Sequence, residues 1–257
     1  MSDLPVYLIN LDGSDERLRS ASGQLNHAGQ VFQRVPAFDG RKLRVDQFLD
    51  YDAGAALRYL GRPMRGGEIG CYLSHLDCAR RFLASGAEHC IVLEDDMQLQ
   101  PGYAEGVRKV LAWLGRQDLD WDLINIGANR HKIYTAIHEF DAGGQQHALT
   151  RAHYFPMTTT ALIWSRQGAR AFVAEHGAIF AAVDNYFRHW LTRTDRGLAV
   201  WPPLVTTTGA ESEIAGAGRN RRSAEGRHPL YGLLKQRRLL TDKFIAWRHK
   251  RRAARTS

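Results

Sequence analysis

Cysteine and long apolar runs are what this sequence has least of. Its 257 residues contain three cysteines, Cys71, Cys78 and Cys90, and no Cys-x-x-Cys pair. This usage excludes a disulfide scaffold, predicts reduced and buried thiols, and makes a zinc site unexpected. No stretch approaches the roughly 18 apolar residues of a membrane-spanning helix, and the first residues lack a basic, apolar leader. We therefore expect a cytoplasmic protein.

Acidic residues are scarce at the C-terminal end. Residues 219–257 contain 13 Lys/Arg and only 2 Asp/Glu, a net charge of +11, whereas the preceding residues contain 22 and 25, a net charge of −3. The hydrophobic content of 44% and the six tryptophans indicate a packed core. We expect one folded domain over residues 1–218 and a basic tail over residues 219–257.

Apolar segments alternate with helical patterns in the first half of the chain, which favours an α/β sheet with crossover connections. No internal repeat is found. Residues 128–150 are expected to form a hairpin or a mobile loop. Strands are expected at 5–10, 31–35, 90–93, 121–126, 158–164 and 198–205, and helices at 14–28, 45–60, 68–85, 101–114, 167–175, 183–191 and 229–252.

Three consecutive acids, Glu94, Asp95 and Asp96, directly follow the apolar run Cys90–Leu93. Adjacent carboxylates repel one another unless a cation neutralises them, and Mn²⁺ or Mg²⁺ prefers oxygen ligands. Because side chains alternate along a strand, Glu94 and Asp96 are expected to hold the metal, while Asp95 faces the other side and is a candidate for contacting a bound ligand. The alternative is a solvated acidic turn.

A second group of polar residues ends the first strand. Asn10, Asp12 and Arg17 lie where an α/β fold binds a nucleotide, and the forked guanidinium of Arg17 suits a phosphate. The alternative for Arg17 is a surface position in a first helical turn.

A third group begins a helix after Gly66 and Gly67. Glycines let the backbone approach a ligand closely, and the N–H groups that open a helix attract anionic oxygens. Glu68, Ser74 and His75 follow, and all three are candidates for binding such a ligand. A lone helical histidine also serves as a satisfied structural residue.

Three of these segments resemble, in order, the motifs of glycosyltransferase family 25. They are Val6–Asp12 with Arg17, Gly67–His75 and Ile91–Asp96. Weaker echoes follow at Asp122–Gly127, at Asp184–Tyr186, and at Pro203–Val205 with Glu211–Ile214. The family includes bacterial enzymes that extend lipopolysaccharide or lipooligosaccharide, and related domains glycosylate collagen in animals.

The resemblance implies a GT-A-type mixed sheet flanked by helices. It further implies transfer of a hexose, with galactose as the favoured candidate, from a UDP-sugar donor to a glycan or glycolipid acceptor. It also implies inversion to a β-linkage. Asp184 matches the family's later acidic position and is our candidate for the base that accepts the acceptor proton. Its alternative role is a helix N-cap.

Two departures from the family pattern concern the site. Thr206, Thr207 and Thr208 replace a glutamine that the family leads us to expect, and no third metal ligand is identifiable. Asp195 and Glu211 are the remaining candidates for that ligand.

The tail predicts a basic amphipathic helix over residues 229–252. Its apolar arc comprises Leu230, Leu233, Leu234, Leu240, Phe244, Ile245 and Trp247, and the opposite side carries Lys235, Arg238, Lys243 and Lys250. Such a helix suits an anionic membrane surface, here the inner face of the plasma membrane. It also suits docking on the domain, whereas nucleic acid is a weaker alternative because the domain is slightly acidic.

The same acids suit two other functions. One is a metal-dependent phosphohydrolase that cleaves a nucleotide diphosphate with water. The other is a catalytically silent protein that binds membrane or nucleic acid. The residues do not determine the donor sugar, the acceptor, the linkage or the oligomeric state.

Overall fold

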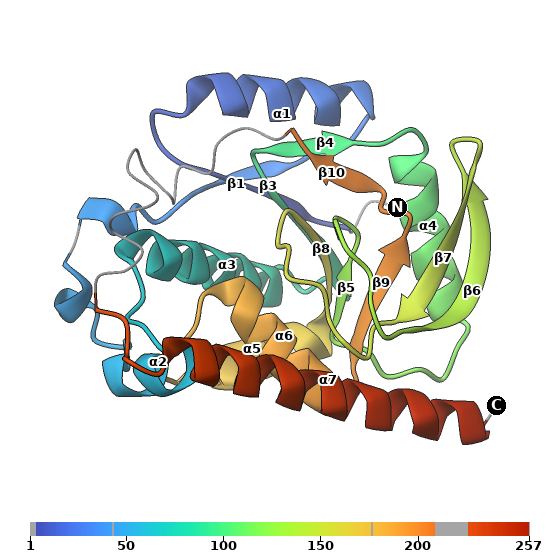
Figure 1. The fold of residues 1–257 in the computed structure, drawn as a ribbon. Helices are drawn as coiled ribbons and strands as arrows, with labels where there is room; N and C mark the ends of the chain where they lie inside the picture. Colours follow the sequence, from blue (N-terminus) through green and yellow to red (C-terminus); the bar gives the residue numbers. More distant parts are fainter. Residues whose placement is uncertain (1–3, 43, 176, 209–225, 257) are drawn as a thin grey trace.

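One mixed sheet of eight strands forms the centre of the protein, with helices on both faces (Figure 1). The computed structural model describes residues 4–42, 44–175, 177–208 and 226–256. The strand order is β2-β1-β3-β8-β5-β9-β7-β6, and a separate two-stranded ribbon pairs β4 with β10. The strands are β1 Val6–Asn10, β2 Gln33–Pro36, β3 His89–Glu94, β4 Met97–Leu99, β5 Leu123–Asn125, β6 Thr135–Ala142, β7 Gln145–Arg151, β8 Ala161–Ser165, β9 Gly197–Trp201 and β10 Val205–Thr207. The expected α/β class is confirmed.

Two apolar cores lie on the two faces of the sheet. One core packs α1 and α4 against the sheet, and the other packs α2, α3, α5 and α6 against the opposite face. The helices are α1 Asp15–His27, α2 Ala53–Leu60, α3 Gly66–Ser85, α4 Tyr103–Leu114, α5 Arg166–Glu175, α6 Val183–Thr194 and α7 Tyr231–Thr256, and two short 3₁₀ turns span Gly40–Lys42 and Val45–Gln47.

Strand β1 lies between β2 and β3 and is parallel to both. The connection from β1 to β2 passes through α1 on one face, and the connection from β2 to β3 passes through α3 on the other. The chain therefore reverses direction across the sheet between β1 and β3. In open α/β sheets, such a reversal leaves a crevice at the carboxyl ends of the two strands.

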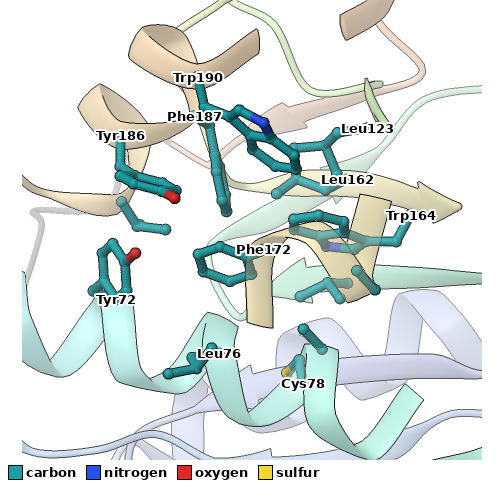
Figure 2. Close-up of a cluster of buried hydrophobic side chains, with 14 of the residues drawn as sticks. Tyr72, Leu76, Cys78, Leu123, Leu162, Trp164, Phe172, Tyr186, Phe187 and Trp190 are labelled. Atoms are coloured by element: carbon teal, nitrogen blue, oxygen red, sulfur yellow. The ribbon is translucent and has the colours of Figure 1, made fainter. Parts of the chain in front are cut away.

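An aromatic cluster fixes the helices on the α3 face of the sheet. Figure 2 shows Trp164 of β8, Phe172 of α5 and Tyr72 of α3 meeting the α6 residues Tyr186 and Phe187. Ring centroids of Trp164 and Phe172 lie 5.4 Å apart, and those of Tyr72 and Tyr186 also lie 5.4 Å apart. These contacts set where the N-terminal turns of α3 and α6 lie relative to the strand ends.

Several expected elements differ from those observed. Of the two expectations for residues 128–150, the hairpin is confirmed, as β6 pairs with β7, whereas other elements differ. Only residues 53–60 of the expected 45–60 helix are α-helical, and the expected 198–205 strand is divided between β9 and β10. The dividing segment contains Pro202 and Pro203, and a proline cannot donate a ladder hydrogen bond. The expected boundary at residue 218 lies outside the described residues.

Helix α7 packs across α2 and α6, along the lower edge of the molecule as drawn in Figure 1. Its docked face includes Asp242 and Ala246, which are almost fully buried, and Leu234 and Ile245, which are partly buried. Leu234 and Ile245, at one edge of the expected apolar arc, therefore turn toward the domain, and the other five residues of the arc are exposed. No helix within the described ranges is both long enough and apolar enough to cross a membrane.

The charged side expected for α7 is also wrong in part. The Arg238 guanidinium lies 4.9 Å from the centre of the Tyr59 ring, and Lys250 Nζ lies 5.8 Å from that of Tyr134. Both cations thus contact the domain, where long side chains can lie along aromatic surface.

Candidate functional site

The three acids lie at the crevice between β1 and β3. Ile9 of β1 is paired with Glu94, the last residue of β3. A cavity of about 130 Å³ opens there. Its walls come from the ends of both strands, α1, α3 and the segment after β2: Ile9, Leu11, Arg17, Ala37, Phe38, Asp39, Gly40, Arg41, Gly67, Cys71, Ser74, Glu94, Asp95 and Asp96.

Asp95 is held between two of the predicted ligand-binding residues. Asn10 Nδ2 donates to Asp95 Oδ2 at 2.7 Å, and Arg17 Nη1 lies 3.1 Å from Asp95 Oδ1. Arg17 Nη2 also lies 3.7 Å from Asp96 Oδ2. The expected placement of Asp95 and Asp96 on opposite sides is therefore wrong. Strand β3 ends at Glu94, so these two residues form a turn in which strand alternation no longer holds.

Glu94 is oriented from α3 and from the segment before β8. His75 Nε2 lies 3.0 Å from Glu94 Oε1, and the Thr159 hydroxyl donates to the same oxygen at 2.7 Å. Burial works to raise the pKa of Glu94, but these contacts and the charge of Arg17 outweigh it and hold the pKa below its ordinary value. His75 is fully buried and does not line the cavity, so it positions Glu94.

The pKa of Asp96 is shifted in the opposite direction from that of Glu94. Burial, together with the negative charge of Glu94, raises the pKa of Asp96 to about 6, although Arg17 opposes the shift. Asp96 Oδ1 is buried and has no hydrogen-bond partner among the residues that the structure describes. A buried carboxylate oxygen in this condition is suited to receive a cation.

Ser74 holds one wall of the cavity in place. Its hydroxyl accepts from Phe38 N at 2.9 Å and donates to Gly70 O at 2.8 Å. The segment that contains Phe38 and Gly40 packs very closely on α3. A Cβ added at Gly70 would lie 2.3 Å from Phe38 O, and one added at Gly40 would lie 1.9 Å from Gly66 O. Glycine is needed at both positions for this approach.

Four predicted ligand-binding residues, Asn10, Asp12, Glu68 and His75, lie outside the cavity lining. The carboxylate of Asp12 is largely exposed and pairs with Arg34. Glu68 accepts from both Nη atoms of Arg62, at 2.6 and 2.8 Å, and from Arg65 N at 2.8 Å. Glu68 therefore caps α3 in this structure, and a role for it in binding the donor stays a prediction.

Asp184 lies in the first turn of α6, where Ala182 and not Asp184 occupies the N-cap position. Its Oδ1 accepts from Asn185 N at 2.6 Å and from Asn185 Nδ2 at 2.9 Å. Burial raises the pKa of Asp184. Asp184 does not line the cavity, and its role as the base stays a prediction.

Residues that the sequence pattern does not single out also belong to the site. Thr159 reaches Glu94 because β8 runs antiparallel to β3 and pairs Ala161 with Leu93. Thr208 N donates to Asp96 O at 2.8 Å. Asp195 ends α6 and instead contacts His153 Nδ1 at 2.8 Å. The other suggested metal ligand, Glu211, lies outside the described residues, as does the Glu211–Ile214 part of the last motif echo.

The sequence of this chain is similar to those of known glycosyltransferases. Residues 3–187 match the family described as Glycosyltransferase family 25 (LPS biosynthesis protein). A glycosyltransferase 25 family member from Aedes aegypti is 36% identical over 129 residues, covering 49% of this chain and 21% of that protein. Procollagen galactosyltransferase 1 of Danio rerio is 26% identical over 220 residues, covering 79% of this chain and 36% of that protein. The chain therefore spans well under half the length of both relatives.

Two solved structures align over most of the chain with little sequence identity. A glycosyltransferase involved in glycosylation of the major capsid of PBCV-1 gives a TM-score of 0.42 at 8% identity and covers 82% of this chain and 94% of that one. The galactosyltransferase LgtC, solved with donor and acceptor sugar analogues, gives 0.40 at 14% identity and covers 89% and 95%. The family match extends over more than half of the chain and includes all three acids, and this chain belongs to glycosyltransferase family 25.

Proposed function

We propose that this chain is a metal-assisted hexosyltransferase of the GT-A type. It moves galactose from UDP-galactose to a sugar hydroxyl of a lipopolysaccharide- or lipooligosaccharide-type glycan, with inversion at the anomeric carbon. The observation that carries the proposal is the placement of Glu94, Asp95 and Asp96 beside a cavity where β1 and β3 end. The names of the procollagen galactosyltransferase relatives support galactose, and the family's description supports the acceptor class.

The site residues fit a hard divalent cation such as Mn²⁺ or Mg²⁺. Glu94 and Asp96 supply carboxylate oxygens, which these ions prefer. One oxygen of Asp96 is buried without a hydrogen-bond partner in the described part of the chain. A cation bound there would neutralise the charge that develops on the leaving diphosphate.

The chain's own residues perform the remaining tasks in this proposal. Asn10 and Arg17 orient Asp95 toward the donor, and the amide groups that open α3 at Gly67 attract anionic oxygens. Asp184 accepts the proton of the acceptor hydroxyl. The acceptor oxygen then bonds to the anomeric carbon. At the same time the bond between the anomeric carbon and the β-phosphate oxygen breaks, which releases UDP.

A donor screen tests this function. The purified chain is incubated with Mn²⁺, candidate disaccharide acceptors and UDP-galactose, UDP-glucose or UDP-N-acetylglucosamine, and UDP release is measured while mass spectrometry identifies the product. We expect UDP and an extended glycan, with activity lost in EDTA and in Asp96→Ala but kept in Asp77→Asn, which alters an exposed acid on α3. UMP and sugar phosphate as products would instead identify a phosphohydrolase.

We further propose that α7 places the enzyme on an anionic membrane surface, at the inner face of the plasma membrane. Opposite its docked face, α7 presents Leu233, Leu240, Phe244 and Trp247, which are each at least 51% exposed. Arg237, Lys243, Arg248 and Arg251 surround this stripe and are also exposed. Apolar side chains bordered by cations match a surface of anionic headgroups over acyl chains, where a lipid-linked acceptor is found.

Vesicle cosedimentation tests this placement. We expect the full chain to sediment with phosphatidylglycerol vesicles more than with phosphatidylcholine vesicles, and less as salt rises. A variant with Leu240, Phe244 and Trp247 all changed to serine is expected to lose binding, whereas Val31→Ser, an exposed apolar residue elsewhere, keeps it. Binding to duplex DNA without vesicle binding would contradict the proposal.

A further inference from the structure

We propose that Cys71, His75 and Glu94 form a second cation site, selective for zinc-like ions, that shares Glu94 with the proposed Mn²⁺ site. Cys71 Sγ lies 3.9 Å from Glu94 Oε1, and His75 Nε2 lies 3.0 Å from the same oxygen. One ligand atom from each residue lies within 4.8 Å of the other two. The expectation that a zinc site is absent rested on spacing in the sequence and did not consider this grouping.

The fold brings the three ligands together from two elements. Cys71 and His75 are four residues apart on α3, so their side chains share one face of the helix. Glu94 ends β3, against which α3 packs. Because the helix and the strand pack against each other through one buried apolar core, the ligand atoms are held near one another before any ion binds.

The distances suit a tetrahedral ion. Bonds of about 2.3 Å to sulfur and about 2.0–2.2 Å to nitrogen and oxygen place ligand atoms about 3.3–3.7 Å apart. The two observed separations differ from these values by a few tenths of an ångström. Cys71 and Glu94 line the cavity, so the fourth position faces solvent or a bound ligand.

The donor set determines which ion binds. Thiolate and imidazole ligands suit Zn²⁺ and Co²⁺, whereas Mn²⁺ and Mg²⁺ prefer carboxylate oxygens. The cluster therefore discriminates against the cation that Glu94 and Asp96 would hold. Binding of the zinc-like ion forms a metal–sulfur bond as the Cys71 thiol releases its proton to solvent.

A regulatory consequence follows, and it rests on the proposed function. Two divalent cations that share the Glu94 carboxylate would lie close together and repel each other. Occupancy of the site formed by Cys71, His75 and Glu94 therefore weakens Mn²⁺ binding, and Zn²⁺ inhibits transfer less as the Mn²⁺ concentration rises.

Co²⁺ spectroscopy tests the site without any sugar nucleotide. The full chain, kept reduced, is titrated with Co²⁺ while the near-ultraviolet thiolate-to-cobalt band and the visible ligand-field bands are recorded. We expect one Co²⁺ per chain with tetrahedral bands, and their loss on addition of Zn²⁺. Absence of the thiolate band in the wild-type chain overturns the proposal, whatever the variants do.

Two variants assign the sulfur, with circular dichroism confirming that each is folded. Cys71→Ser is expected to lose the thiolate band, and Cys78→Ala, at a buried cysteine about two helical turns further along α3, is expected to keep it. A band that survives in Cys71→Ser, or disappears in Cys78→Ala, overturns the assignment.

An activity measurement then separates this inference from the proposed function. Zn²⁺ is expected to inhibit Mn²⁺-dependent UDP release at a concentration at least tenfold lower in the wild-type chain than in Cys71→Ser. A chain that shows the cobalt spectrum but transfers no sugar contradicts the proposed function alone. A chain that transfers sugar without the cobalt spectrum contradicts the cation site alone.

Discussion

His75 and Glu94 meet across the boundary between α3 and β3, with Nε2 of the histidine 3.0 Å from Oε1 of the glutamate. Thr159 donates to the same oxygen from the other side. The two neighbours restrict the orientation of Glu94 and hold its pKa below the ordinary value despite burial. A carboxylate held charged and oriented in this way is ready to ligate a cation.

Removal of the Thr159 hydroxyl tests whether that orientation matters. Thr159→Val keeps the shape of the side chain but removes the hydrogen bond to Glu94. We expect the Mn²⁺ concentration that half-activates UDP release to rise by about 10- to 100-fold, the usual effect of losing an outer-shell partner. Thr159→Ser retains a hydroxyl and is expected to restore most of the affinity. Equal Mn²⁺ dependence in the two variants would contradict the role.

Substitution of Asp184 tests the proposed base. Asp184→Asn keeps an acceptor for the Asn185 amide but cannot accept a proton. We expect kcat for transfer to fall by about 10²- to 10⁴-fold, while UDP binding measured by calorimetry stays within about twofold. A fall in UDP affinity that accounts for the whole loss of rate would show that Asp184 serves binding and not proton transfer.

The metal-free protein is expected to gain stability when Asp96 loses its charge. Its folded pKa of about 6 lies above the unfolded value of 3.8, so stability falls as pH rises from 3.8 to 6 and the cost persists above pH 6. Asp96→Asn should therefore raise the free energy of unfolding at pH 7.5 by on the order of 1–3 kcal/mol. Urea unfolding in EDTA measures this difference in the free energy of unfolding. The difference between Asp96→Asn and the wild type should vanish near pH 3.5.

The buried His189 is expected to make the folded protein less stable in acid. Burial, with help from the charges of Arg193 and Arg238, lowers its folded pKa from 6.5 to about 4. The unfolded chain therefore binds a proton first as pH falls, and stability is lost between pH 6.5 and 4. Thermal unfolding of His189→Gln is expected to depend less on pH across this window than that of the wild type. Parallel profiles for the two proteins would contradict this role.

The pair between Asp242 and Arg193 is expected to hold α7 on the domain. Asp242 is 1% exposed, and its Oδ1 accepts from Arg193 Nη1 at 3.0 Å. Arg193→Met leaves the buried Asp242 carboxylate without its ion-pair partner, so it should lower the free energy of unfolding by about 1–3 kcal/mol and speed amide exchange in α7. The matched control, Asp77→Asn, breaks an exposed pair with Arg81 and should change stability by less than about 0.5 kcal/mol.

Strand and helix positions followed closely from local pattern. The run before Glu94 is a central strand, and Gly86 ends α3 in the left-handed conformation that glycine favours. The expectations differed from the structure where contacts with residues distant in sequence determine the position of a side chain. Arg17 draws Asp95 and Asp96 to one guanidinium, and Arg62 engages Glu68, which local pattern had offered to a ligand.

The sequence by itself determined the α/β class, the three-acid motif and the family resemblance, because period, apolar runs and motif order are local properties of the chain. Tertiary structure alone decided which residues surround Glu94, since His75 and Thr159 reach it only after α3 and β8 pack beside β3. It also decided that α7 docks through Asp242 while Phe244 faces outward. A helix with two apolar sides has no preferred face until the domain supplies a partner for one of them.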